Sequence, residues 1–147
     1  MSFSPFSIKA RVYYEDTDAG GIVYYANYLK FSERCRTEWL RGSGVSQQKL
    51  LESHFGYVIC DIKGKYHKSA KLDDVLTITC IPIKVRYTRI TFYQQIFNQN
   101  AELLFELQCN IAYVDLNDGR PVAMPEEAQV YTKAQMPENP ESYGVNL

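Results

Sequence analysis

The sequence predicts an α+β fold in which an antiparallel β-sheet curls around one long helix. Three observations support this prediction: a strand-like segment opens the chain, one amphipathic helix follows, and about four strand-like segments occupy most of the remainder. Strands spaced this closely are antiparallel, because parallel neighbours need a crossover of a dozen or more residues. The single helix must bury its apolar stripe against one face of the sheet, which gives two layers.

The helix is predicted by apolar residues that recur at steps of three and four, namely Tyr24, Tyr28, Phe31, Cys35 and Trp39. This spacing places them on one face of about four helical turns. We expect the helix to end at "RGSG", because Gly42 and Gly44 can adopt the left-handed conformation that closes helices. A short second helix is predicted over 46–54, with Ser46 as its N-terminal cap.

The opening strand is predicted over 7–14, where apolar and polar residues alternate, and the later strands are rich in β-branched and aromatic residues. In "YVICDIKGKYHKSA", Gly64 indicates a bulge or bend. Asp73 and Asp74 are expected to form the turn into the next strand. The predicted organisation is a single domain over 1–132, followed by a polar, proline-containing tail over 133–147 that should fray.

Composition excludes several classes of function. The formal net charge of -1 gives no global attraction to nucleic acid or to anionic membranes. No apolar run approaches the ~20 residues of a membrane span. Four cysteines without a C-x-x-C pair, and no secretory leader, predict buried reduced thiols in a cytoplasmic protein.

The stretch "YEDTDAGG" concentrates three carboxylates and two glycines just before the predicted helix. A turn alone needs fewer acids, so some of them are candidates for chemistry. Asp16 and Thr17 suit a structural role through side-chain bonds to the backbone, and Glu15 suits a solvated loop position. Asp18 has two interpretations, as a cap of the helix or as a catalytic carboxylate.

The segment "YYEDTDAGGIVYYANYLKFSERCRTEWLR" resembles the signature of acyl-CoA thioesterases of the 4-hydroxybenzoyl-CoA thioesterase family. Within it, the chain is most similar to the YbgC-like branch associated with the bacterial Tol–Pal system. The likeness continues through "LDDVLTI" and "GRPVAMP" and covers about 7–130. It implies the hotdog fold, an antiparallel sheet wrapped around a central helix.

The resemblance implies that Asp18 is the catalytic nucleophile or general base, and that the backbone N–H of Tyr25 polarises the thioester carbonyl. The chemistry is consistent with this, because N–H groups at a helix start are suitable donors to a developing oxyanion. Gly21 and its neighbour Gly20 allow close backbone approach. The closest branch usually carries His where this chain has Tyr25, which leaves the identity of the general acid open.

Further positions have both an implied role and a simpler alternative. The resemblance places Lys84, Arg86 and Arg89 against the phosphates of coenzyme A, and the alternative is a solvated basic turn. Glu33 matches a helix carboxylate that some hotdog enzymes take from a neighbouring subunit, and the alternative is an exposed or salt-bridged residue.

The predicted function is hydrolysis of acyl-CoA to a free acid and coenzyme A. No bound cofactor is expected, since coenzyme A arrives with the substrate, and His54 and His67 are too isolated to predict a metal site. Hotdog subunits usually pair, so a homodimer or a tetramer of dimers is expected. A Tol–Pal partner is implied only by the resemblance. The alternatives are a hotdog dehydratase, an enzyme acting on acyl carrier protein thioesters, and a non-catalytic acyl-CoA-binding module.

Overall fold

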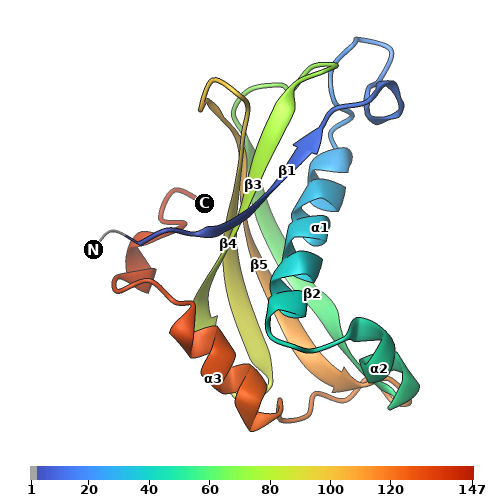
Figure 1. Cartoon of the computed structure of the whole chain (residues 1–147), viewed down its shortest axis with the longest axis vertical. Helices are drawn as coiled ribbons and strands as arrows, with labels where there is room; N and C mark the ends of the chain where they lie inside the picture. The colour runs from blue at the N-terminus through green and yellow to red at the C-terminus, as the bar shows by residue number, and fades with distance from the viewer. Residues whose placement is uncertain (1–2) are drawn as a thin grey trace.

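A computed structural model of the chain describes residues 3–147 and has the predicted two-layer α+β architecture (Figure 1). The five strands are antiparallel and lie in the order β1-β3-β4-β5-β2. They are β1 (Phe6–Arg11), β2 (Phe55–Tyr66), β3 (Val75–Val85), β4 (Arg89–Phe97) and β5 (Leu103–Asp115). The helices are α1 (Asn27–Gly42), α2 (Gln47–Glu52) and α3 (Glu126–Ala134), with 3-10 turns at Tyr14–Asp16 and Pro140–Ser142.

Helix α1 packs along one face of the sheet, as its apolar periodicity predicts (Figure 1). Its buried stripe includes Tyr28, Phe31, Cys35 and Trp39. Tyr24 does not belong to the helix, because its N–H donates to the Asp16 carbonyl and holds it in the preceding loop. The helix therefore starts three residues later than predicted. Helix α2 begins as predicted, since the Ser46 hydroxyl accepts a hydrogen bond from the Lys49 N–H.

The irregularity predicted at Gly64 lies elsewhere. The register between β2 and β5 shifts between Ile59 and Asp61, whereas Gly64 pairs regularly with Leu107. A Cβ atom at Gly64 would lie 2.9 Å from Cζ of Phe105. Glycine at this position therefore allows close packing of a ring against the strand and does not mark a bulge.

Strand β2 is a long edge strand with exposed apolar residues. Val58, Ile59 and Ile62 are 37–45% exposed. Cys60 is also exposed, so the prediction of four buried thiols is wrong at this position, while Cys35, Cys80 and Cys109 are buried as expected. Within residues 3–147, no helix is long and apolar enough to cross a membrane.

The C-terminal segment packs on the sheet face opposite α1. Phe92 packs on Trp39 of α1, so Tyr93, the next residue of β4, points to the other face. The ring of Tyr143 lies there, with its centroid 5.8 Å from that of Tyr93. The Leu147 carbonyl accepts a hydrogen bond from Lys63 Nζ at 3.3 Å. Tyr143 and Leu147 therefore contact the sheet, whereas the tail was predicted to fray. The sequence also did not predict helix α3.

Candidate active site

The acidic segment forms a tight loop that presents Asp18 at its tip. An antiparallel bridge between Thr17 and Val23 closes the loop. Inside it, the Asp18 N–H donates to the Ile22 carbonyl (2.9 Å), and the Gly21 N–H donates to the Asp18 carbonyl (3.0 Å). Gly21 has φ +79°, a left-handed conformation that favours glycine.

The neighbouring acid and hydroxyl hold the loop, as predicted. Asp16 Oδ2 accepts a hydrogen bond from the Tyr13 N–H (2.9 Å), and Thr17 Oγ1 donates to the Tyr14 carbonyl (2.7 Å). The Asn27 side chain donates to the Asp16 carbonyl and so ties the loop to the first residue of α1. Glu15 is exposed.

The Asp18 carboxylate is exposed and does not cap the helix. Its Oδ1 accepts one hydrogen bond, from the Gly20 N–H at 2.8 Å, while Oδ2 accepts none from residues 3–147. Helix α1 has Ala26 at its N-cap position, without a side-chain cap. The capping interpretation of Asp18 is therefore wrong. Asp18 instead lines a cavity of about 470 Å³ together with Tyr14, Thr17, Ala19, Gly21 and Leu72. Sequence reasoning did not single out Tyr14 or Leu72.

Tyr25 lies in the turn that leads into α1. Its side chain is 63% exposed and does not line the Asp18 cavity. A hydrogen bond with the Tyr25 hydroxyl raises the pKa of Tyr24 above its ordinary value. The backbone N–H of Tyr25 donates to no acceptor among the described residues. This N–H is therefore available to a ligand.

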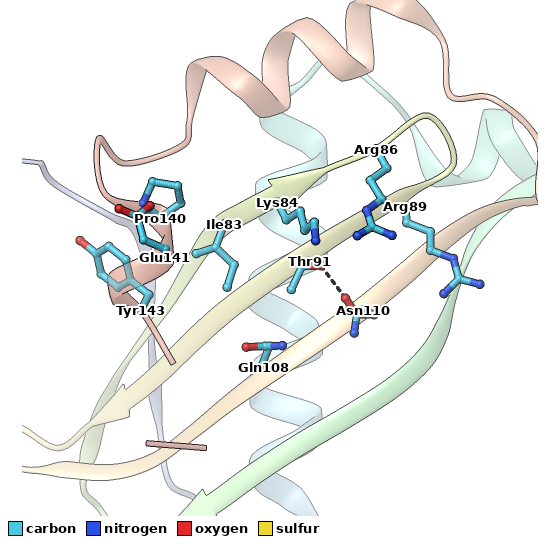
Figure 2. Close-up of a pocket in the computed structure, with 10 residues that line it drawn as sticks. All are labelled: Ile83, Lys84, Arg86, Arg89, Thr91, Gln108, Asn110, Pro140, Glu141 and Tyr143. Carbon is cyan, nitrogen blue, oxygen red and sulfur yellow. Dashed lines mark hydrogen bonds between the residues drawn. The ribbon is translucent and has the colours of Figure 1, made fainter. Parts of the chain in front are cut away.

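The basic residues of the β3–β4 turn lie in a second cavity, of about 640 Å³, on the sheet face opposite α1 (Figure 2). Its lining consists of Ile83, Lys84, Arg86, Arg89, Thr91, Gln108, Asn110, Pro140, Glu141 and Tyr143. Several of these are polar strand residues, and Thr91 donates a hydrogen bond to Asn110. The C-terminal residues in this lining were not anticipated.

Within one chain, Asp18 and the basic turn are far apart. Arg89 pairs across the sheet with Ala112, which pairs with Val58 near the start of β2. Tyr25 lies at the other end of β2, where its carbonyl accepts a hydrogen bond from the Tyr66 hydroxyl (2.8 Å). Eight residues of strand span about 26 Å. The predicted site residues therefore do not form one site in a single chain.

Glu33 is exposed on α1 and lines a small groove of about 60 Å³ between this helix and β2. Arg36, Tyr57, Val58 and Ile59 are among the other residues of this groove. Glu33 makes no ion pair within residues 3–147. The groove opens beside the exposed face of β2, so a residue from another chain could reach it.

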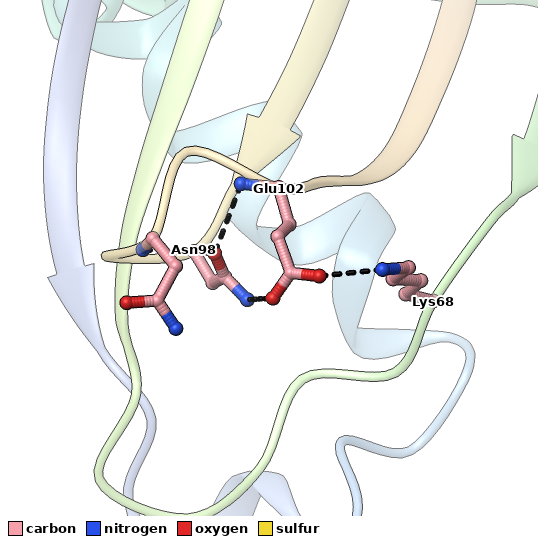
Figure 3. Close-up of polar contacts among 4 residues, drawn as sticks. Lys68, Asn98 and Glu102 are labelled. Carbon is pink, nitrogen blue, oxygen red and sulfur yellow. Dashed lines mark hydrogen bonds and ion pairs between the residues drawn. The ribbon is translucent and has the colours of Figure 1, made fainter.

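Two polar networks near the end of β2 were not predicted. His67 Nε2 lies 2.6 Å from Glu106 Oε2, and the Tyr93 hydroxyl donates to Glu106 Oε1 at 3.0 Å. In the second network, Glu102 pairs with Lys68 and accepts a hydrogen bond from the Asn98 amide at 3.0 Å (Figure 3). Both networks fasten the segment after β2 to the sheet. The part of the chain that the structure describes has no cluster of three or more His, Cys, Asp or Glu placed to hold a metal ion.

The model of the thioesterase-like superfamily matches residues 12–131, which include the loop, α1 and the whole sheet after β1. The chain belongs to the thioesterase-like superfamily. An acyl-CoA thioesterase YbgC from Haemophilus influenzae is 43% identical over 125 residues, which cover 84% of this chain and 91% of the relative.

A second relative, the acyl-CoA thioester hydrolase YbgC of Escherichia coli, is 41% identical, and the match covers 85% of this chain and 93% of the relative. A Staphylococcus aureus protein solved in complex with CoA shares the fold, with a TM-score of 0.85 at 17% identity. That match covers 93% of this chain and 89% of the other.

Proposed function

We propose that this chain is an acyl-CoA thioester hydrolase in which Asp18 carries the chemistry and the Tyr25 N–H holds the developing oxyanion. The observation behind this proposal is the state of the Asp18 carboxylate. It is exposed in a cavity before the start of α1, and one of its oxygens accepts no hydrogen bond from residues 3–147. The names of relatives that are 41–43% identical support the reaction class.

The reaction replaces the C–S bond of the thioester with a C–O bond. Asp18 either attacks the carbonyl carbon, forming an anhydride that water then hydrolyses, or removes a proton from the water that attacks directly. In both routes the carbonyl oxygen becomes negative, and the free N–H of Tyr25 can donate to it, aided by the positive end of the α1 dipole.

The leaving group explains why Tyr can replace His at position 25. Coenzyme A leaves as a thiolate, and an alkyl thiol has a pKa of about 8.5. Such a group departs without first receiving a proton from an acid. The side chain of Tyr25 therefore need not act as a proton donor, and the backbone N–H role does not depend on which side chain is present.

We further propose that the working unit is a homodimer joined along β2. The strand has twelve residues, lies at the sheet edge, and exposes Val58, Ile59 and Ile62. Unpaired edges of this kind pair readily with another strand. A two-fold axis pairs the strands antiparallel, so the Tyr66 end of one β2 lies beside the Val58 end of the other.

In such a dimer each active site takes residues from both chains. Asp18 and Tyr25 come from one chain, while Lys84, Arg86 and Arg89 of the other approach from the Val58 end and bind the phosphates of coenzyme A. Glu33 of the second chain would then lie near the acyl group. Pairs of dimers can form tetramers. No cofactor is needed, because water and acyl-CoA supply every reacting atom.

We place the enzyme in the cytoplasm. Its four cysteines are free, which suits a reducing compartment, and one of them, Cys60, is exposed on the β2 edge.

The experiment that tests the proposal measures thiol release from short, long and aromatic acyl-CoAs by wild type and Asp18→Asn. The amide keeps the shape and the hydrogen bond from Gly20 but removes the charge. We expect kcat to fall by ~10²-fold or more, a loss of ~2.7 kcal/mol of transition-state stabilisation. Asp118→Asn is the matched control. Asp118 is also exposed, and its carboxylate accepts a hydrogen bond from the N–H of Arg120, two residues later, as Asp18 does from Gly20.

Equal turnover by wild type and Asp18→Asn would contradict the assignment of Asp18. Saturable binding of acyl-CoA by wild type without thiol release would contradict hydrolysis itself and favour a binding module.

A further inference from the structure

We infer that Tyr66 is a positioning residue that orients the oxyanion donors at the start of α1. The inference rests on the proposed role of the Tyr25 N–H. Its basis is a hydrogen bond of 2.8 Å from the Tyr66 hydroxyl to the Tyr25 carbonyl, which joins the last residue of β2 to the turn before α1. Among residues 3–147, Tyr66 is the one side chain that donates to a carbonyl of the turn 24–26.

The Tyr66 ring is held in place on one side. Its centroid lies 4.7 Å from that of Phe105 and 5.4 Å from that of Tyr28, in an edge-to-face arrangement with the latter. Both neighbours are buried in the core. Burial raises the pKa of Tyr66 above its ordinary value, so its hydroxyl is protonated and can donate at neutral pH. The donor is therefore held against the core on one side, while half of the Tyr66 side chain is exposed on the other.

Because the peptide group is planar, the hydrogen bond to the Tyr25 carbonyl also fixes the direction of the N–H group in the same peptide. In a planar trans peptide the C=O and N–H groups point in opposite directions. The Tyr24 carbonyl accepts the Asn27 N–H at 2.8 Å, which fixes the Tyr24–Tyr25 peptide. The Tyr66 hydroxyl fixes the next peptide, between Tyr25 and Ala26. The N–H groups of Tyr25 and Ala26 point away from these anchors.

Neither N–H donates to any acceptor among the described residues. Both are therefore open to a substrate oxygen, and the turn can supply two donors. The bond from Tyr66 also withdraws electron density from the Tyr25–Ala26 peptide, which makes the Ala26 N–H a stronger donor.

The test compares Tyr66→Phe with Tyr113→Phe in the whole chain of 147 residues. Phenylalanine keeps the ring packing and removes only the hydroxyl, so Tm should change little. We expect Tyr66→Phe to lower kcat by about 10-fold, which is the effect of losing one oriented hydrogen bond. KM and the inhibition constant of free coenzyme A should not change. Tyr113 lies on the neighbouring strand β5, and its ring packs against Phe55 and Tyr57. Its hydroxyl makes no hydrogen bond among residues 3–147, and its variant should retain the wild-type kcat.

The outcomes separate this inference from the proposed function. If kcat of Tyr66→Phe matches that of Tyr113→Phe while Asp18→Asn is inactive, Tyr66 has no positioning role and the proposed function stands. A parallel rise in KM or a large fall in Tm would also overturn the inference, because it would indicate binding or folding. If Asp18→Asn retains full turnover, the proposed role of Asp18 fails, whatever the result for Tyr66→Phe.

Discussion

The guanidinium of Arg36 donates a hydrogen bond of 2.7 Å to Oε1 of Gln94 in the interior between α1 and the sheet. Gln94 is fully buried, and its amide nitrogen donates to the carbonyls of Ser32 and Thr79. This one side chain therefore links α1, β3 and β4. Arg36 is 7% exposed, so its charged group lies in the interior beside this acceptor.

Replacing Gln94 with Leu should destabilise the fold strongly. The substitution leaves the buried Arg36 without its acceptor and removes two further hydrogen bonds, so we expect a loss of about 2–4 kcal/mol. In a chain of this size that corresponds to a fall in Tm of roughly 6–12 °C, measured by calorimetry. Gln48→Leu, on the exposed surface of α2, is the control. An unchanged Tm for Gln94→Leu would show that the link contributes little.

The two glycines of the Asp18 loop should respond differently to alanine. A Cβ at Gly20 would lie 3.2 Å from Asp18 Oδ1, so Gly20→Ala should displace the carboxylate and lower kcat with little change in stability. Gly21 has φ +79° with open space around it, so Gly21→Ala should cost about 1 kcal/mol of stability through backbone strain alone. Thermal unfolding and thiol release together distinguish these effects.

Gly44 provides the control for strain, since it has φ +81° and is equally open, away from the site. Gly44→Ala should match Gly21→Ala in stability and leave kcat unchanged. A normal kcat in Gly20→Ala would argue against the need for a precisely held Asp18.

The dimer that we propose predicts that two inactive variants restore each other's activity. A heterodimer of Asp18→Asn with an Arg86→Ala, Arg89→Ala chain contains one intact site and one doubly defective site. With differently tagged chains purified as heterodimers, we expect about half of wild-type activity, against little for either homodimer. Absence of recovery would mean that Asp18 and the two arginines act within one chain.

Acid should remove the contribution of Glu102 to stability. Hydrogen bonds from Lys68 and then Asn98 lower the pKa of Glu102 below its ordinary value. Because the folded-state pKa is lower than the unfolded one, the stabilisation is complete above the unfolded pKa, about 4.3, and is lost as pH falls through the folded value. The Tm difference between wild type and Glu102→Gln should therefore be present at pH 7 and vanish in strong acid.

Glu15→Gln is the control for that titration, since Glu15 makes no hydrogen bond or ion pair among residues 3–147. Its Tm should follow that of wild type at each pH. If the Tm difference between wild type and Glu102→Gln persists in acid, the contact between Lys68 and Glu102 does not depend on charge.

Periodicity predicted the parts of the fold in which one face is buried within the chain. The helical spacing of Phe31 and Trp39 was sufficient to identify the α1 stripe, because a 3.6-residue repeat places such residues together. Helix α3 was missed, since it buries only Ala128 and Thr132 and so carries a weak apolar signal. The pattern also could not show that Val58 would be exposed, because an apolar strand residue reads the same whether it is buried within the chain or lies on an edge strand.

The sequence predicted the local contacts of the loop that carries Asp18, but it did not predict the contacts between distant segments. The structural roles of Asp16 and Thr17 follow from bonds to residues three positions away, which short-range turn chemistry anticipates. The contact between His67 and Glu106 spans 39 positions in sequence and depends on the register of β2 with β5. The contact of Tyr66 with Tyr25 spans 41 positions and was missed for the same reason.

The two borders of the sheet differ in a way that limits how many chains can join. At the far border, β1 has only six residues, follows Pro5, and carries the exposed cations Lys9 and Arg11. Charges and proline discourage further strand pairing. Once two β2 strands have paired, the combined sheet ends in β1 on both sides. In the proposed dimer, assembly through strands therefore stops at two chains, and a growing filament is avoided without any additional capping element.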